Sequence, residues 1–203
     1  MALSLPGLPS ARRYNLTTCH DPAFVWFRVA KTGTRTFLEL LNERGLHLDA
    51  EHPMNVHYPV SSYRDHFKFA FVRNPWDRLV SSWRNKVVDQ NWWKLSAERR
   101  DHLLDFSNFV AYVSTLDVAR CDVHLRSQSS VIDLNNLDYL ARFESFDVEV
   151  RAILARLGLE VDEIPHRNAS VEDRSYREYY VDGLADQVGS LYRKDAQLFR
   201  YDF

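Results

Sequence analysis

A chain of 203 residues can bury a substantial core within one domain, so we expect a single domain over residues 1–203, with 1–20 as an irregular N-terminal segment. Apolar residues make up 45% of the chain and charged residues 27%, which is ordinary for a water-soluble globular protein. The net charge of −2 provides no global basic field. We therefore expect no nucleic-acid or membrane-surface partner, and any anion site must be local.

The cysteines and the opening residues bear on the compartment. Cys19 and Cys121 offer neither a disulfide framework nor metal-ligand spacing, so we expect reduced thiols and no metal. Residues 1–13 contain two prolines and no long apolar core, unlike a signal peptide or a membrane anchor. No other run approaches transmembrane length. These features predict a cytoplasmic protein.

The first predicted unit is a strand, a polar loop and a helix. Residues 24–30 are apolar and β-favouring apart from Arg28, as expected for a buried strand. A polar turn with one glycine follows at 31–36. Residues 37–44 then carry apolar side chains at helical spacing, and Gly45 is placed to end that helix.

The same order recurs in the second predicted unit. Residues 67–72 are almost entirely apolar and predict a buried strand. Pro75 is well placed as the first residue of a helix, where its missing N–H is not needed, and Asp77 puts a carboxylate in the first turn. The apolar face of this helix is marked by Leu79, Val80, Trp83 and Val87.

The remaining elements complete an α/β pattern. We expect helices over 103–116 and 147–157, short strands over 131–134 and 137–143, and a helical stretch over 176–199 with a break near Gly183. Alternating strands and helices predict a three-layer, P-loop-like fold whose central sheet is mainly parallel and flanked by helices. Ligands in such folds bind beyond the carboxyl ends of the strands, where both polar turns lie.

The turn at 31–36 has the composition of an anion site. Gly33 permits close approach of the backbone, the helix N-terminus favours negative charge, and Lys31 adds a mobile cation. The alternative is an ordinary strand-to-helix loop in which a threonine caps the helix. A Walker loop of a nucleotide kinase is opposed, because its lysine follows the second glycine, whereas Lys31 precedes the only glycine here.

Three segments resemble one family. Residues 24–37, with Lys31-Thr32-Gly33-Thr34, resemble the 5′-phosphosulfate loop of sulfotransferases that use 3′-phosphoadenosine 5′-phosphosulfate (PAPS). Residues 69–81 resemble the 3′-phosphate segment of that superfamily, in the branch of carbohydrate sulfotransferases and their bacterial relatives. A third match runs from 176–180 through 191–195 to the C-terminus. Three departures occur: Ala30 replaces the usual proline, Arg35 stands where a small residue is common, and Arg200 stands where the tail usually carries glycine.

The resemblance implies PAPS as the sulfuryl donor, with no metal. It implies that Arg73 and Ser81 bind the 3′-phosphate, a role that suits the planar fork of an arginine at a strand end. Arg174 and Tyr176 would belong to a loop over the nucleotide. The resemblance also implies that the 5′-phosphosulfate of PAPS is bound by the loop of Lys31, Thr32, Gly33, Thr34, Arg35 and Thr36.

The chemistry needs a cation near the bridging oxygen and a base for the acceptor hydroxyl. Lys31 is the expected cation. His57 is the expected base because relatives often carry a histidine before the 3′-phosphate segment; His52 and then His124 are the alternatives.

Acceptor contacts are expected from a second group of residues, namely Arg84, His124 and Gln128. For His124 and Gln128 an inert polar turn is the alternative, and Arg84 could equally face solvent. The branch implies a carbohydrate or glycolipid acceptor. A catalytically silent nucleotide-binding protein and a P-loop nucleotide kinase remain as other functions, and the sequence leaves the oligomeric state open.

Overall fold

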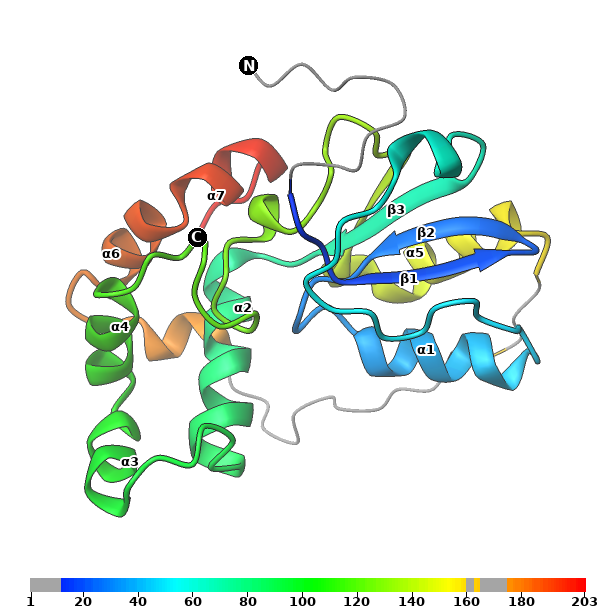
Figure 1. Cartoon of the computed structure of the whole chain (residues 1–203). Helices are drawn as coiled ribbons and strands as arrows, with labels where there is room; N and C mark the ends of the chain where they lie inside the picture. Colours follow the sequence, from blue (N-terminus) through cyan, green and yellow to red (C-terminus); the bar gives the residue numbers. More distant parts are fainter. Residues whose placement is uncertain (1–11, 160–162, 165–174) are drawn as a thin grey trace. The chain divides into compact units, whose positions relative to one another are not determined.

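The computed structural model describes residues 12–159, 163–164 and 175–203 (Figure 1). Their contacts group them into two compact units. The sheet unit comprises the described residues of 1–72 and 131–167, and the helical unit comprises those of 73–130 and 168–203. No helix within the described residues is both long and apolar enough to cross a bilayer.

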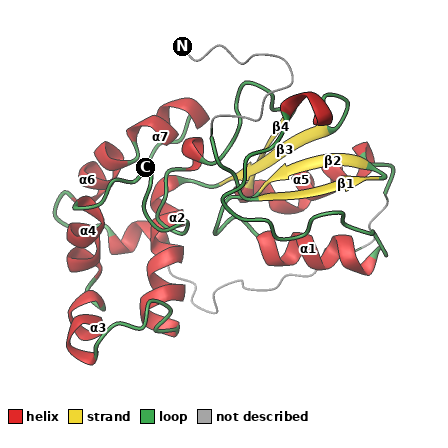
Figure 2. Cartoon of the chain, viewed as in Figure 1, coloured by secondary structure: helices red, strands yellow, loops and turns green. Residues whose placement is uncertain are grey.

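The sheet unit is built on four strands, β1 (Leu16–His20), β2 (Ala23–Phe27), β3 (Phe67–Val72) and β4 (Tyr139–Arg142). They lie in the order β1-β2-β3-β4 (Figure 2). β1 and β2 form an antiparallel hairpin, whereas β2–β3 and β3–β4 are parallel pairs. The expected α/β fold with a mainly parallel sheet is therefore confirmed.

One face of this sheet packs against α1 (Thr34–Glu43) and α5 (Phe146–Arg156). Because successive side chains of a strand point to opposite faces, Phe24 and Trp26 of β2 face these helices. Burying each such side chain stabilises the fold by about 1.5–3 kcal/mol. The shared apolar cluster includes Phe37, Leu40, Leu41, Phe69, Phe71, Val150, Ile153 and Leu154.

The segment before β3 packs onto the same unit through backbone and aromatic contacts. Antiparallel bridges join Tyr14 to Val56 and Thr18 to Ala50, along β1. The ring of Tyr58 meets those of Tyr14 and Phe27 edge-on, with centroids 5.4 and 5.5 Å away. These contacts fix the main chain on both sides of position 57.

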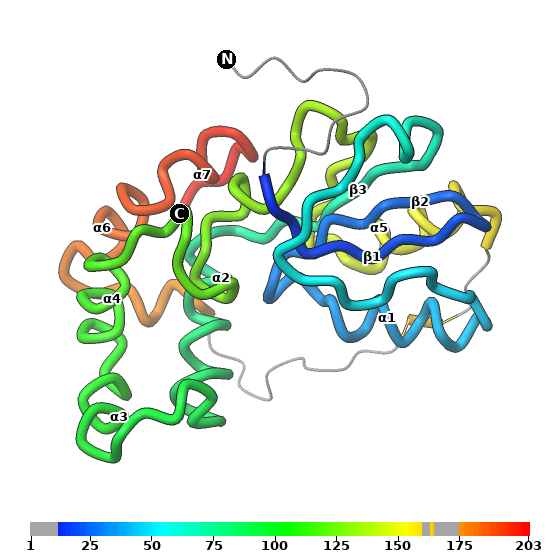
Figure 3. Tube along the Cα trace, in the orientation of Figure 1, coloured from blue at the N-terminus to red at the C-terminus, as the bar shows by residue number. Residues whose placement is uncertain are grey.

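The helical unit contains five of the seven α-helices in the described residues. α2 (Pro75–Trp83) continues directly into a π-helical segment, Arg84–Asp89. The chain path can be followed in Figure 3. The others are α3 (Ala97–Leu103), α4 (Phe106–Ser114), α6 (Leu184–Leu191) and α7 (Arg193–Phe199), with 3₁₀ turns at Gln128–Ser130 and Tyr176–Tyr179.

Several sequence predictions agree with these elements. The strand predicted at 67–72 coincides with β3, and Pro75 is the first residue of α2. The break predicted near Gly183 is present, because Gly183 has a left-handed backbone (φ 80°) immediately before α6. The helix predicted at 147–157 is α5, and the strand predicted at 137–143 is β4.

One element prediction is wrong, and two elements were missed. Residues 131–134 form no strand, because Asp133 is drawn instead into a 2.5 Å hydrogen bond from the Tyr58 hydroxyl. The helix predicted at 103–116 corresponds to α4, whereas α3, which ends at Leu103, was not predicted. Between them the Asp105 carboxylate accepts the Ser107 N–H at 2.7 Å and starts a new helix. The expectation of an irregular segment over residues 1–20 is wrong for its last five residues, which form β1 and pair with β2.

Candidate functional site

The loop between β2 and α1 has an unusual backbone. Lys31 and Gly33 both have left-handed φ values, 72° and 78°, with Thr32 between them at negative φ. Left-handed residues of this kind occur in loops whose successive N–H groups face one anion. A lysine seldom adopts this conformation, and such strain concentrates at functional sites.

The first turn of α1 leaves its main-chain donors without a capping side chain. The N-cap is Gly33, which has no side chain that could accept from the first turn of this helix. The Thr32 and Thr34 hydroxyls turn back and donate to the Val29 carbonyl at 2.8 and 3.1 Å. The alternative of a threonine cap is thus wrong. The loop offers main-chain N–H groups as donors, rather than these two hydroxyls.

Gly33 is required for space as well as for φ. A Cβ at this position would lie 2.4 Å from Cε2 of Phe146, the first residue of α5. The ring of Phe146 packs in turn against Phe71 and Phe143, with centroids 5.3 and 5.6 Å away. The loop backbone therefore lies directly on an aromatic ring.

The remaining predicted residues of the loop differ in exposure. Lys31 is half-buried and Arg35 is exposed, while Thr36 is buried on the inner side of α1. Lys31, the cation of this loop, is therefore partly covered by protein and partly open to solvent. Arg35 lies in the first turn with its side chain in solvent.

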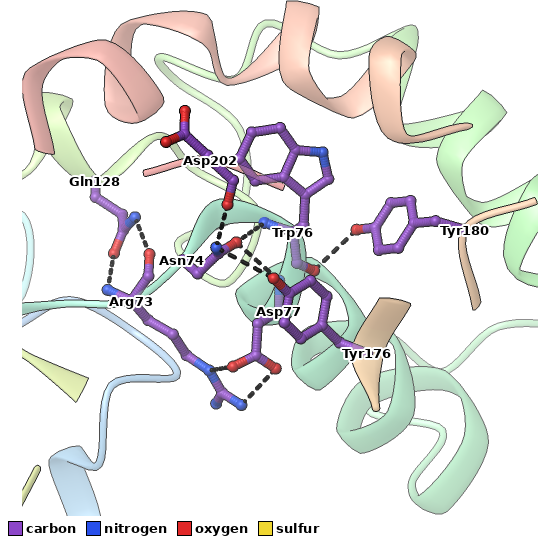
Figure 4. Close-up of polar contacts among 8 residues, drawn as sticks. All are labelled: Arg73, Asn74, Trp76, Asp77, Gln128, Tyr176, Tyr180 and Asp202. Carbon is purple, nitrogen blue, oxygen red and sulfur yellow. Dashed lines mark hydrogen bonds and ion pairs between the residues drawn. The ribbon is translucent and has the colours of Figure 1, made fainter. Parts of the chain in front are cut away.

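In the helical unit, Arg73 follows directly after β3 in the chain, and its guanidinium is paired with Asp77 (Figure 4). Nε and Nη2 donate to the two carboxylate oxygens, each at 2.8 Å. The two side chains are only 16% and 23% exposed. A phosphate at Arg73 must therefore share the guanidinium with Asp77 or displace it. The i,i+4 spacing was the signal in the sequence for this pair.

Ser81 lies one helical turn beyond Asp77 on α2, and Arg84 lies about one turn further. Asp77 and Ser81 therefore lie on one side of α2, and Arg73 precedes the helix, which begins at Pro75. Ser81 and Arg84 are both half-buried. The predicted 3′-phosphate residues, Arg73 and Ser81, thus flank the carboxylate that holds the guanidinium.

The start of α2 is held by residues from the end of the chain. The Asn74 side chain accepts the Trp76 N–H at 3.0 Å and donates to the Asp202 carbonyl at 2.9 Å and to the Tyr176 hydroxyl at 3.4 Å. Tyr180 donates to the Trp76 carbonyl at 2.8 Å (Figure 4). Tyr176 thus lies at the start of α2, and Arg174 lies outside the described residues.

Two predicted acceptor residues make well-defined internal contacts. Gln128 is fully buried, and its side-chain amide bonds the main chain of Arg73. His124 Nδ1 lies 2.8 Å from Asp122 Oδ1, and its ring meets Trp92 edge-on at 5.9 Å. Burial opposes ionisation of Asp122, but hydrogen bonds from the ring and main chain of His124 outweigh it and lower the pKa of Asp122 to about 2.

The two candidate bases of the sheet unit differ in their surroundings. His52 Nδ1 lies 3.0 Å from Arg28 Nη1, and its Nε2 lies 3.1 Å from Glu51 Oε1. Because arginine only donates, Nδ1 accepts and Nε2 carries the proton toward Glu51. Both ring nitrogens of His52 are therefore engaged. His57 is exposed, between the bridge at Val56 and the buried ring of Tyr58.

A model of the sulfotransferase family matches residues 14–202. The chain belongs to the sulfotransferase family. This confirms the family resemblance predicted from the loop and the arginine segment. Among solved structures, the chain is similar to a sulfotransferase from Alicyclobacillus acidocaldarius, with 16% identity and a TM-score of 0.36. That match covers 71% of this chain and 58% of the other. A search of curated proteins gives no significant match.

Proposed function

We propose that this chain transfers a sulfuryl group from PAPS to a hydroxyl group of an acceptor, with a carbohydrate or glycolipid as the acceptor class. The observation that supports it best is the loop at 31–34. Its left-handed residues, Lys31 and Gly33, stand at the start of α1, where the main-chain N–H groups lack a side-chain cap from the N-cap residue. Family membership over residues 14–202 supports the same reaction class.

The donor set of this loop fits the phosphosulfate end of PAPS. Oriented main-chain N–H groups and a helix N-terminus favour an anion, and Lys31 adds a full positive charge. Gly33 lets an oxyanion approach the backbone without a side chain between them. Lys31 would stabilise the negative charge that grows on the bridging oxygen as the sulfuryl group leaves.

The 3′-phosphate is assigned to Arg73 and Ser81. β2 and β3 are parallel neighbours, and Arg73 is the residue directly after Val72 at the carboxyl end of β3. Ligands of open α/β sheets bind beyond this edge. Asp77 fixes the guanidinium in advance, and Ser81 supplies a hydroxyl one turn further along α2. Pre-positioning reduces the entropy lost on binding, while the Asp77 charge lowers the net attraction.

His57 is assigned as the base that takes the acceptor proton. His57 is an exposed residue in the segment before β3, so an acceptor hydroxyl can reach it. In the transfer, the acceptor oxygen bonds to sulfur, the bond from sulfur to the phosphate oxygen breaks, and adenosine 3′,5′-bisphosphate leaves.

Transfer of label from ³⁵S-PAPS to a panel of sugars, glycolipids and phenols tests this function. We expect labelled product with at least one sugar or glycolipid, together with stoichiometric adenosine 3′,5′-bisphosphate. Binding of the bisphosphate without transfer to any acceptor would identify a silent nucleotide-binding protein instead. Transfer of a phosphoryl group from ATP to an acceptor, with ADP as the other product, would point to a kinase.

A further inference from the structure

The side chain of Gln128 is bonded to the main chain of Arg73 on both sides. Its Oε1 accepts the Arg73 N–H at 2.9 Å, and its Nε2 donates to the Arg73 carbonyl at 2.8 Å (Figure 4). Gln128 is fully buried. The paired bonds resemble those that a neighbouring strand would make. They hold the backbone of Arg73 directly beyond Val72, the last residue of β3.

Gln128 is itself fixed by a buried carboxylate. Asp195 on α7 accepts the Gln128 N–H at 2.6 Å and the Ser129 N–H at 2.9 Å, one with each oxygen. Asp195 is 0% exposed. A carboxylate buried to this degree is costly unless it is hydrogen-bonded, and here the main chain of the 128–129 turn supplies the bonds.

Further contacts from α2 and the C-terminal helices hold the residues before this turn. The buried Arg78 guanidinium donates to the Arg126 carbonyl at 2.5 Å, and the Tyr192 hydroxyl donates to the Leu125 carbonyl at 2.6 Å. Burial lowers the pKa of Arg78, and the nearby Tyr192 and Asp195 partly oppose that shift. The position of Gln128 is therefore determined by α2 and α7 together.

We propose that Gln128 and Asp195 are positioning residues for the 3′-phosphate arginine, an inference that rests on the proposed function. Neither residue contacts the nucleotide; both act through the backbone of Arg73. Fixing this backbone sets the direction in which the guanidinium leaves the chain, toward Asp77. A loss of this restraint weakens binding of the 3′-phosphate and leaves the 5′-phosphate contacts unchanged.

The test measures, by calorimetry, the affinity ratio between adenosine 3′,5′-bisphosphate and adenosine 5′-phosphate. Gln128→Met keeps the length of the side chain but removes both hydrogen bonds to Arg73. We expect the ratio to fall about fivefold or more, with the 5′-phosphate affinity within twofold of the parent. Arg73→Ala should bring the ratio close to one. Arg193→Ala, which removes an exposed charge on α7, should leave it unchanged.

The outcomes separate this inference from the proposed function. A normal ratio in Gln128→Met, together with its collapse in Arg73→Ala, overturns the positioning role while the 3′-phosphate assignment stands. A normal ratio in Arg73→Ala overturns both. If Gln128→Met does not fold, the same affinity ratio is measured in Asp195→Asn, where we expect a smaller fall. Hydrogen exchange at the Arg73 amide gives a measurement that does not depend on nucleotide. In Gln128→Met this exchange should be at least tenfold faster than in the parent. Unchanged exchange would show that Gln128 does not restrain the Arg73 backbone.

Discussion

Replacing Gly33 with alanine should destabilise the sheet unit for two separable reasons. The left-handed backbone at φ 78° costs an alanine about 1–2 kcal/mol. The new Cβ would also lie 2.4 and 2.8 Å from ring atoms of Phe146, which cannot withdraw freely because Phe71 and Phe143 pack against it. Such overpacking costs about 1–3 kcal/mol. Together they predict a loss of about 2–5 kcal/mol in the free energy of unfolding.

Gly158 supplies a matched control, because it has a similar φ of 74° but no atom of the described residues, apart from its chain neighbours, lies within 4 Å of an added Cβ. Gly158→Ala should therefore show only the backbone cost. Urea unfolding of the single variants, and of Gly33→Ala combined with Phe146→Leu, measures the two contributions. The leucine removes the obstructing ring atoms, so it should recover about 1–3 kcal/mol of the loss. Equal losses in Gly33→Ala and Gly158→Ala would refute the close contact with Phe146.

Three further substitutions test the assigned roles. Lys31→Ala should lower turnover at least a hundredfold, with a smaller effect on bisphosphate affinity. Lys194→Ala, which removes an exposed charge on α7, is the control and should leave turnover unchanged. If turnover in Lys31→Ala stays within twofold of the parent, Lys31 is not part of the mechanism. His57→Ala should lower turnover by roughly a hundredfold and leave bisphosphate affinity unchanged, whereas His52→Ala should lower turnover only slightly. If His52→Ala causes the large loss instead, His52 is the base. Asp122→Asn should lower stability by about 1 kcal/mol at pH 5, allowing for solvent screening. Because the folded pKa of Asp122 is about 2, below its usual value of 3.8, this contribution is present above about pH 4 and is lost as the pH falls through 2. A difference in urea midpoint between variant and parent that does not change with pH would contradict the pairing of Asp122.

Local signals accounted for the elements that the sequence predicted well. The run at 67–72 is almost entirely apolar, and an asparagine cap with Pro75 at the first helical position defines the start of α2. Gly183 similarly begins α6 through its own positive φ. In each case the residues that determine the structure are neighbours in the chain.

Contacts between distant residues account for what the sequence did not reveal. Residues 131–134 have the apolar character of a strand, but the bond from Tyr58, 75 residues away, holds Asp133 in a different conformation. The role of Gln128 depends on Asp195, 67 residues further along the chain. β1 carries two buried threonines, and one of them, Thr17, is satisfied by the Glu51 carbonyl at 2.7 Å. Their polarity concealed a strand that is buried on both faces.

Calorimetric titration of the parent protein with adenosine 3′,5′-bisphosphate and with adenosine 5′-phosphate tests the central claim most directly. A charge-assisted contact to the 3′-phosphate is worth about 1.5–3 kcal/mol, which corresponds to roughly a tenfold to hundredfold preference. We predict that the bisphosphate binds at least tenfold more tightly, and that Arg73→Ala removes this preference. Equal affinities for the two nucleotides would contradict the assignment of Arg73 and Ser81 to a 3′-phosphate site.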